Sequence, residues 1–146
     1  MSIQKSERGD EGFSFMETLI VLAITIMLSA GIGIPAARHI ERAKRARASA
    51  QIETFRIALH SYYLDCGQYP SEEQGLAALF AKPTMHPVPE DWQGPYTDRR
   101  VPDDPWGHAY SYIVPGPEGL VWGIASYGTD GTEGGDGNDR DINSWD

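Results

Sequence analysis

The sequence predicts an α+β protein in which one long N-terminal helix carries a small C-terminal domain. Residues 13–34 are almost wholly apolar, residues 36–64 contain neither glycine nor proline, and residues 109–126 hold two short β-prone runs around a proline- and glycine-rich turn. About 110 residues follow residue 35, enough for one modest hydrophobic core. We expect three parts: a leader at 1–12, a hydrophobic helix at 13–35 and a globular head at 36–146.

The apolar segment runs from Phe13 to Ile34 and contains one charged residue, Glu17. Because about 20 apolar helical residues cross a bilayer, the segment is long enough to span a membrane. A secretory signal peptide has a shorter apolar region with the small-residue cleavage site after it, whereas here Gly12 precedes the run. Cleavage after Gly12 would keep the apolar segment in the mature protein. The alternative is an ordinary single-span anchor with Glu17 near the membrane interface.

We expect one long helix from about residue 14 to 64, with a kink at residues 31–35, where two glycines precede a proline. Its second half is rich in strong helix formers. Apolar residues close to helical spacing predict an amphipathic stripe of Ile40, Ala43, Ala50, Phe55, Leu59 and Tyr62. Alanines in the first part of the stripe favour packing against other helices, and the bulkier residues from Ile52 onward favour packing on the head. Gly67 and Pro70 should end the helix.

The head is predicted to contain a second, short helix at 71–80. Ser71 is its expected N-cap, and Gln74 would complete a capping box. Residues 81–105 hold six of the ten prolines, which predicts an ordered loop. Strands at 109–114 and 120–126, joined by residues 115–119, predict a β-hairpin.

Charge is distributed unevenly along the chain, whose net charge is -9. The head is acidic overall, which excludes a nucleic-acid-binding role that needs a basic face. Six Lys and Arg residues within 38–56 adjoin the apolar segment, where anionic headgroups or acidic neighbours would meet them. Only Lys5 and Arg8 precede that segment. Taken alone, this bias would place the head in the cytoplasm.

Acidic and glycine residues alternate near the C-terminus, where residues 126–145 read SYGTDGTEGGDGNDRDINSW. Carboxylates crowded into one loop repel each other, and calcium favours about 6–8 oxygen ligands in irregular geometry. We therefore expect a calcium site, although neither the EF-hand spacing nor a stacked nonapeptide repeat fits. The alternative is a flexible acidic tail. The apolar Ile142 and Trp145 indicate that the segment folds back onto the head.

Nothing in the sequence predicts catalysis. The four histidines lie far apart without zinc-ligand spacing, and nucleophile-elbow, phosphate-loop and dinucleotide motifs are absent from the sequence. We expect a protein that is not an enzyme. Cys66 is the sole cysteine, so an internal disulfide is impossible. It is either a small buried apolar side chain or a thiol that pairs between chains.

Several segments resemble a known family. GFSFMETLIVLAI, residues 13–24 with Gly12 before them, resembles the cleavage signal of type IV pilin-like proteins. The segments LDCGQYPSEEQGLAAL, DPWGHAYSYIVPG, SYGTDG and DINSW resemble the major pseudopilins of type II secretion systems. This resemblance implies a pilin-like fold and a structural, filament-forming role. A pilin of a type IV pilus and a membrane-anchored calcium-binding adhesin or sensor are the alternatives.

The resemblance also implies processing and partners. A prepilin peptidase would cleave after Gly12, Phe13 would be N-methylated, and Glu17 would serve assembly. The subunit would sit in the bacterial inner membrane as a single-pass protein, with its head in the periplasm, before it joins a periplasmic pseudopilus. Its partners would be other copies of itself, minor pseudopilins, the inner-membrane assembly platform and the lipid bilayer. We follow this topology over the charge bias, because the peptidase requires the leader on the cytoplasmic side.

For the calcium site, the resemblance implies ligands from the C-terminal loop: Asp130, Asp141, Ser126 and the carbonyl oxygens of Tyr127 and Thr132. The family often has a second acidic residue immediately before the aspartate of the DI pair. Here Arg140 occupies that position and Asp139 precedes it. Either Asp139 substitutes as a ligand, or one ligand is missing.

Overall fold

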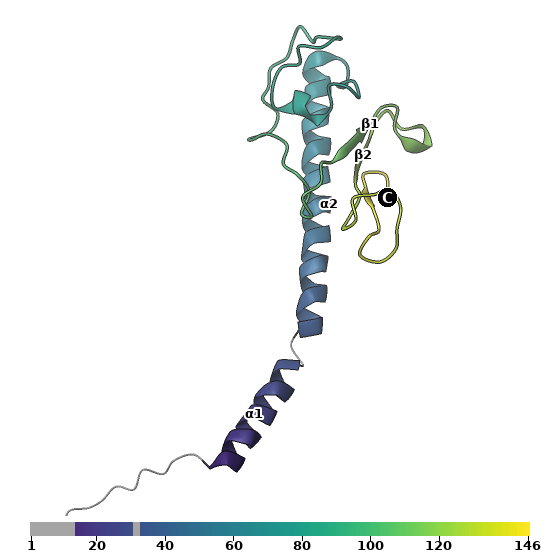
Figure 1. Ribbon diagram of the computed structural model, residues 1–146. Coiled ribbons are helices and arrows are strands. Elements are labelled where there is room, and N and C mark those ends of the chain that lie inside the picture. Colours follow the sequence, from purple (N-terminus) through teal and green to yellow (C-terminus); the bar gives the residue numbers. More distant parts are fainter. Residues whose placement is uncertain (1–13, 31–32) are drawn as a thin grey trace, which may run out of the picture. The chain divides into compact units, whose positions relative to one another are not determined.

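The computed structural model describes residues 14–30 and 33–146 (Figure 1). In chain order its elements are α1 (Phe15–Ala30), α2 (Gly33–Cys66), the 3-10 helix η1 (Leu76–Leu79), β1 (Ser111–Ile113), the 3-10 helix η2 (Pro117–Gly119), β2 (Gly123–Ser126) and β3 (Ile142–Asn143). The chain divides into two compact units, Met1–His39 and Ile40–Asp146. The predicted α+β class is confirmed.

Helix α1 is apolar on all sides, and every side chain described in it is exposed. The hydroxyls of Thr18, Thr25 and Ser29 donate to carbonyls one turn earlier, at 2.7–3.3 Å, so these polar groups are satisfied within the helix. A helix that is apolar all round is normally buried. Among the residues described, no helix has both the length and the apolar character that a membrane crossing requires.

The predicted single helix at 14–64 corresponds to α1 and α2, and Gly31 and Ile32 of the expected kink lie outside the described residues. Helix α2 ends at Cys66, two residues later than predicted. Gly67 follows with φ 70°, and its N–H donates to the carbonyl of Tyr63 at 2.8 Å. This is a left-handed glycine cap, so the predicted role of Gly67 is confirmed.

One face of α2 packs against η1 and the sheet to form the core. The face is correctly predicted from Ile52 onward and wrong before it, because Ile40, Ala43 and Ala50 are exposed and Ala48 is buried instead. Buried side chains from α2, η1 and the sheet make one cluster: Ile52, Phe55, Ala58, Leu59, Tyr62, Leu76, Ala78, Leu79, Tyr110, Tyr112 and Ile124. Because alanine side chains are small, the exposed face of α2 at Ala43 and Ala50 carries little side-chain bulk.

A three-stranded antiparallel sheet in the order β1-β2-β3 covers this core. Strands β1 and β2 pair Tyr112 with Ile124, which confirms the hairpin, although both strands are shorter than predicted. Strand β3 was not predicted. It pairs Ile142 with Ser126, and Trp145 packs so closely on Gly123 that a Cβ there would lie 2.7 Å from its ring. The expectation that the C-terminal segment folds back is therefore confirmed.

The segment predicted as a short helix at 71–80 is a turn followed by η1. Ser71 N–H donates to Gln74 Oε1 at 3.0 Å, and Gln74 N–H donates to Ser71 Oγ at 3.2 Å, as a capping box requires. Gly75 then has φ 58°, outside the right-handed helical region, so an α-helix cannot continue through it. The capping contacts are confirmed, and the α-helix is wrong.

Residues 81–105 contain neither helix nor strand and are pinned to the core, as expected of an ordered loop. The Gln74 side-chain amide donates to the carbonyls of Met85 and Pro87 at 2.7 and 2.8 Å. Trp92 Nε1 donates to the carbonyl of Ala78 at 3.1 Å, and Tyr96 N–H donates to that of Leu79 at 2.7 Å. These bonds satisfy backbone groups that a loop otherwise leaves to water.

Cys66 is partly buried at the end of α2, with its sulfur 3.9 Å from the hydroxyl of Tyr96. Burial raises the pKa of its thiol, which opposes formation of the reactive thiolate. Tyr62 lies beside it, and burial raises the pKa of Tyr62 to about 12. The environment favours the small apolar role for Cys66 over the reactive one.

We predict that Leu59→Ala lowers the free energy of unfolding of residues 36–146 by about 2–5 kcal/mol, because Leu59 is wholly buried and its truncation leaves a cavity. Ile57→Ala is the matched control on the same helix, since Ile57 is 68% exposed and should change stability by no more than about 0.5 kcal/mol. Urea denaturation measures both. Equal losses for the two variants would contradict the assigned core face.

Candidate functional site

The acidic segment between Ser126 and Ile142 is a closed loop, because the strands at its two ends pair with each other. Two glycines make its tight path possible. A Cβ at Gly128 would lie 3.0 Å from the carbonyl oxygen of Asp139, and a Cβ at Gly135 would lie 2.9 Å from the same atom. Both glycines have positive φ, 64° and 92°. The loop is therefore a specific fold that only glycine permits at these positions.

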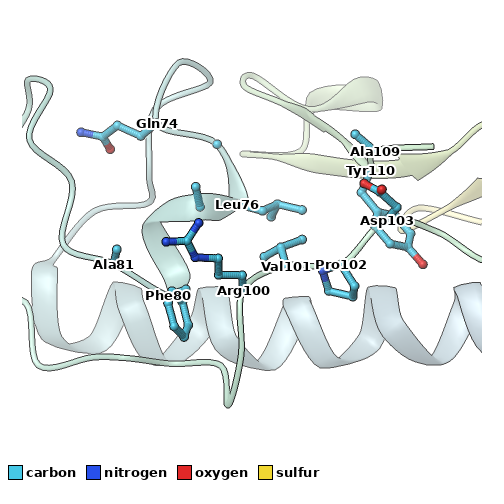
Figure 2. Close-up of a pocket in the computed structure, with 12 residues that line it drawn as sticks. Gln74, Leu76, Phe80, Ala81, Arg100, Val101, Pro102, Asp103, Ala109 and Tyr110 are labelled. Atoms are coloured by element: carbon cyan, nitrogen blue, oxygen red, sulfur yellow. The ribbon is translucent and has the colours of Figure 1, made fainter. Parts of the chain in front are cut away.

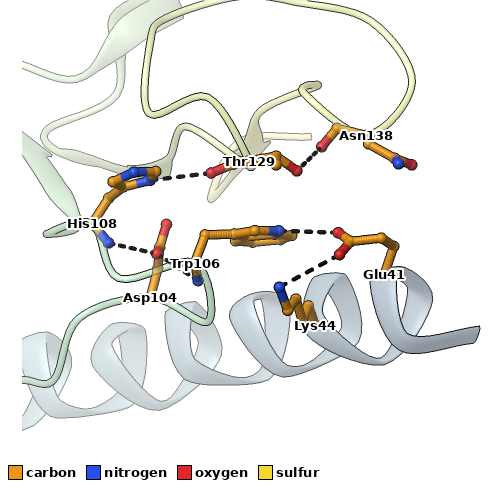
Figure 3. Close-up of polar contacts among 8 residues, drawn as sticks. Glu41, Lys44, Asp104, Trp106, His108, Thr129 and Asn138 are labelled. Carbon is orange, nitrogen blue, oxygen red and sulfur yellow. Dashed lines mark hydrogen bonds and ion pairs between the residues drawn. The ribbon is translucent and has the colours of Figure 1, made fainter. Parts of the chain in front are cut away.

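Two hydrogen bonds cross the loop. Thr129 Oγ1 donates to the carbonyl of Asn138 at 3.0 Å, and Gly134 N–H donates to Asp141 Oδ2 at 2.9 Å (Figure 3 shows the first). They join residues that are nine and seven positions apart along the loop. This argues against the alternative of a flexible tail.

Asp130 and Thr132, both predicted calcium ligands, contact each other. Thr132 donates to the Asp130 carboxylate twice, from its backbone N–H at 3.2 Å and from its hydroxyl at 2.8 Å. These bonds hold the pKa of Asp130 below its ordinary value. The carboxylate is thus kept ionised and oriented, as a hard metal ligand must be.

Asp141, the other carboxylate predicted from its motif, has one atom without a partner. Its Oδ2 accepts from Gly134, whereas its Oδ1 is buried and makes no hydrogen bond to the residues that the structure describes. A buried acceptor without a partner is costly. A cation beside Oδ1 would supply what the atom lacks, so the donor chemistry fits calcium at this point.

The remaining predicted ligands are placed less directly. Ser126 is buried, and its hydroxyl donates to Asp104 Oδ2 at 2.6 Å. Tyr127 and Asp139 are half-buried on the two arms of the loop. Among the described residues, no three His, Cys, Asp or Glu side chains lie close enough together to hold a metal. A calcium site here would rely on backbone carbonyls as well as carboxylates.

Asp104 connects the loop to the segment before β1, a role the sequence did not reveal. Its Oδ1 accepts from the backbone N–H groups of Trp106 and His108 at 3.0 and 2.9 Å, and its Oδ2 accepts from Ser126. The carboxylate is buried. The DPWG motif was visible, but the long-range donor to its aspartate, Ser126, lies 22 residues away.

Trp106 and His108 extend this connection to α2 and to the loop (Figure 3). Trp106 Nε1 donates to Glu41 Oε2 at 3.0 Å, and Lys44 forms an ion pair with the same carboxylate at 3.4 Å. His108 Nδ1 lies 3.2 Å from the carbonyl oxygen of Gly128. The segment before β1 therefore bridges the start of the head helix and the start of the acidic loop.

Two arginines of α2 hold the far end of the loop. Arg45 donates to the carbonyls of Arg140 and Asp141 at 2.6 and 3.4 Å, and Arg56 donates to that of Ser144 at 2.7 Å. Among the six Lys and Arg residues within 38–56, Arg45 and Arg56 therefore bind backbone carbonyls of their own chain. The sequence had indicated only anionic headgroups or acidic neighbours as their partners. Backbone acceptors leave no trace in a sequence, which is why these contacts were missed.

The predicted processing residues, Gly12 and Phe13, lie outside the described residues. Glu17 lies in the first turn of α1 and is exposed. The assigned roles of these three residues remain predictions.

Comparisons with known proteins agree on one family. A family model described as type II secretion system (T2SS), protein G matches residues 36–145. The chain is similar to type II secretion system core protein G of Pseudomonas aeruginosa, with 39% identity over 95% of this chain and 97% of the relative. It is similar to the Vibrio cholerae protein of the same name, with 36% identity over 97% and 95%.

A solved structure gives the same result. The crystal structure of the major pseudopilin from the type 2 secretion system of enterohaemorrhagic Escherichia coli is similar with a TM-score of 0.63 and 35% identity. The similarity covers 75% of this chain and 92% of that chain. It confirms the pilin-like fold.

We predict that Asp104→Ala lowers the free energy of unfolding by at least about 2 kcal/mol, because it removes a buried carboxylate that accepts three hydrogen bonds. Asp103→Ala is the control, since the neighbouring side chain is exposed. Thermal or urea unfolding of residues 36–146 measures the difference. If both variants matched the parent, Asp104 would not be the connection described.

Proposed function

The chain belongs to the protein G family of type II secretion systems, and we propose that it is the major pseudopilin of such a system. In this role it polymerises into the periplasmic pseudopilus, which drives export of folded proteins. The names of the relatives and the similar pseudopilin structure support this role over a type IV pilus pilin and over a calcium-binding adhesin or sensor. The family is structural, which supports a non-enzymatic role.

The observation that carries the proposal is the uncovered surface of α1. Its apolar side chains are exposed on all sides in the described residues, whereas the head has its own complete core. Removing such a surface from water is strongly favourable, and the two environments that can do so are a lipid bilayer and other copies of the same helix. We propose that the subunit resides in the inner membrane, with its head in the periplasm, before it is incorporated into the filament.

Glu17 would favour the filament over the membrane, because its carboxylate finds a charged partner only in the filament. A carboxylate in an apolar setting is costly unless it is paired. Cleavage after Gly12 by prepilin peptidase creates an α-amine at Phe13, which is then methylated. We propose that Glu17 of one subunit pairs with this amine of a neighbour. Minor pseudopilins and the inner-membrane assembly platform are the other proposed partners.

We predict that Glu17→Ala and Glu17→Gln each lower filament yield at least about tenfold, since either leaves the Phe13 amine without its charged partner. Thr25→Ala is the control within α1, because the Thr25 hydroxyl bonds only its own helix. Quantifying filaments from cells that express the full chain with a secretion system gives the yield. Parent-level yield for both Glu17 variants would refute the pairing.

We further propose that the C-terminal loop binds calcium. The buried, unpartnered Asp141 Oδ1, the oriented Asp130 carboxylate and the glycine-shaped backbone support this. Asp130, Asp141 and carbonyls of the loop, with Asp139 in place of the acidic residue that Arg140 replaces, would hold the ion. Bound calcium would neutralise the loop and fix it against the head.

We predict that a calcium chelator lowers the thermal midpoint of residues 36–146 by on the order of 10 °C, because a ligand bound only to the folded state stabilises it. Asp141→Ala should remove this response, and Asp146→Ala, at the exposed chain end, should keep it. Adding calcium back should restore the midpoint. A midpoint indifferent to chelator in the parent would exclude the metal and leave the pseudopilin assignment standing.

A further inference from the structure

A pocket of about 560 Å³ opens on the head between η1 and the segment before β1 (Figure 2). Its walls are mainly apolar and include Leu76, Phe80, Val101 and Pro102. One basic and one acidic side chain, Arg100 and Asp103, also line it. Its volume lies in the range of about 300–1,000 Å³ that is usual for binding pockets. The pocket is therefore large enough to take several side chains of a partner.

A second apolar feature lies at the tip of the hairpin. Leu120 is 44% exposed and Val121 is 62% exposed, directly after η2. Glu118 lies in the same turn, with φ 55°. In Figure 1 this turn and η1 lie on opposite sides of α2. Both features belong to the compact unit Ile40–Asp146, so their separation on the head is fixed.

Arg100 at the pocket and Glu118 in the turn also carry opposite charges. The ion pairs found in the described part of the chain join Lys44 to Glu41 and Arg56 to Glu53, so neither Arg100 nor Glu118 has an ion-pair partner there. Asp103 also lines the pocket, so the complementarity lies in one pair, the Arg100 guanidinium and the Glu118 carboxylate. Charge complementarity of this kind fixes the register of an interface and excludes wrong pairings.

We propose that residues 118–121 of one copy insert into the pocket of the next copy, with Leu120 and Val121 between its apolar walls and Glu118 beside Arg100. The proposal rests on the pseudopilin function. A helical filament needs a heterologous contact, in which two different surfaces of each subunit meet, and a pocket with a matching apolar feature elsewhere on the molecule generates one.

Two other exposed apolar residues of the head, Ile57 and Leu64, suit the pocket less well. Ile57 and Leu64 lie on α2 itself, and a helix with its side chains is about 10–12 Å wide. The adjacent carboxylate of Glu118 further favours the turn as the occupant.

Charge reversal tests the contact in the full chain. Arg100→Glu and Glu118→Arg should each lower filament yield about tenfold, since each places like charges together at the contact. The double variant restores the opposite pair in reverse and should recover most of the yield. Lys82→Glu and Glu90→Arg, exposed residues with the same charge changes, should keep parent yield. An unchanged thermal midpoint for every variant shows that folding is not the cause.

Cross-linking provides a second measurement. In a Cys66→Ser background, Arg100→Cys with Glu118→Cys should give a ladder of linked dimers, trimers and longer chains with a short thiol cross-linker, and either cysteine alone should not. Filaments that form normally in both single reversals, without a ladder, would overturn this contact and leave the pseudopilin function intact. Absence of filaments from the parent chain would instead overturn the function.

Discussion

The structure of the head depends on one buried helix face. Strands of three, four and two residues cannot form a stable sheet alone, and η1 is a single turn. All of them pack on the stripe of α2 from Ile52 to Tyr62, which lies at the bottom of the only core cluster found in the described residues. The same helix also holds the C-terminal segment, because Arg45 and Arg56 donate hydrogen bonds to the carbonyls that flank β3.

This arrangement separates folding from assembly. The head satisfies its own apolar surface, and its acidic loop is connected to α2 both through Trp106 and through Arg45. Helix α1 has no such packing: its apolar side chains remain exposed among the described residues. The subunit therefore combines a domain that buries its own core with a helix whose apolar surface is exposed. Such a helix is suited to packing against copies of itself, as the proposed pseudopilin role requires.

The sequence predicted the features that rest on local pattern. Helical spacing after Ile52, the glycine that ends α2 and the reciprocal Ser71 and Gln74 bonds are all local. The failures involve contacts between distant residues. A two-residue β3 has no periodicity to detect, and a carboxylate such as Asp104 has no local mark of its distant partner Ser126.

The candidate site divides in the same way. Its acidic and glycine residues were visible, and the resemblance to pseudopilins supplied the ligand positions. The buried Asp141 Oδ1 and the arginine contacts to Arg140 and Asp141 emerged only in three dimensions. Among the alanines of α2, the pattern could not decide which face is inward, because alanine suits both a core and an exposed helix.

The most direct test of processing and assembly is the intact mass of the subunit isolated from assembled filaments. We expect a chain that begins at Phe13, lacks residues 1–12 and carries one added methyl group on its N-terminal amine, the group that would pair with Glu17 of a neighbour. A filament subunit that begins at Met1, or a processed chain that remains a lone membrane protein beside an intact secretion system, would contradict it.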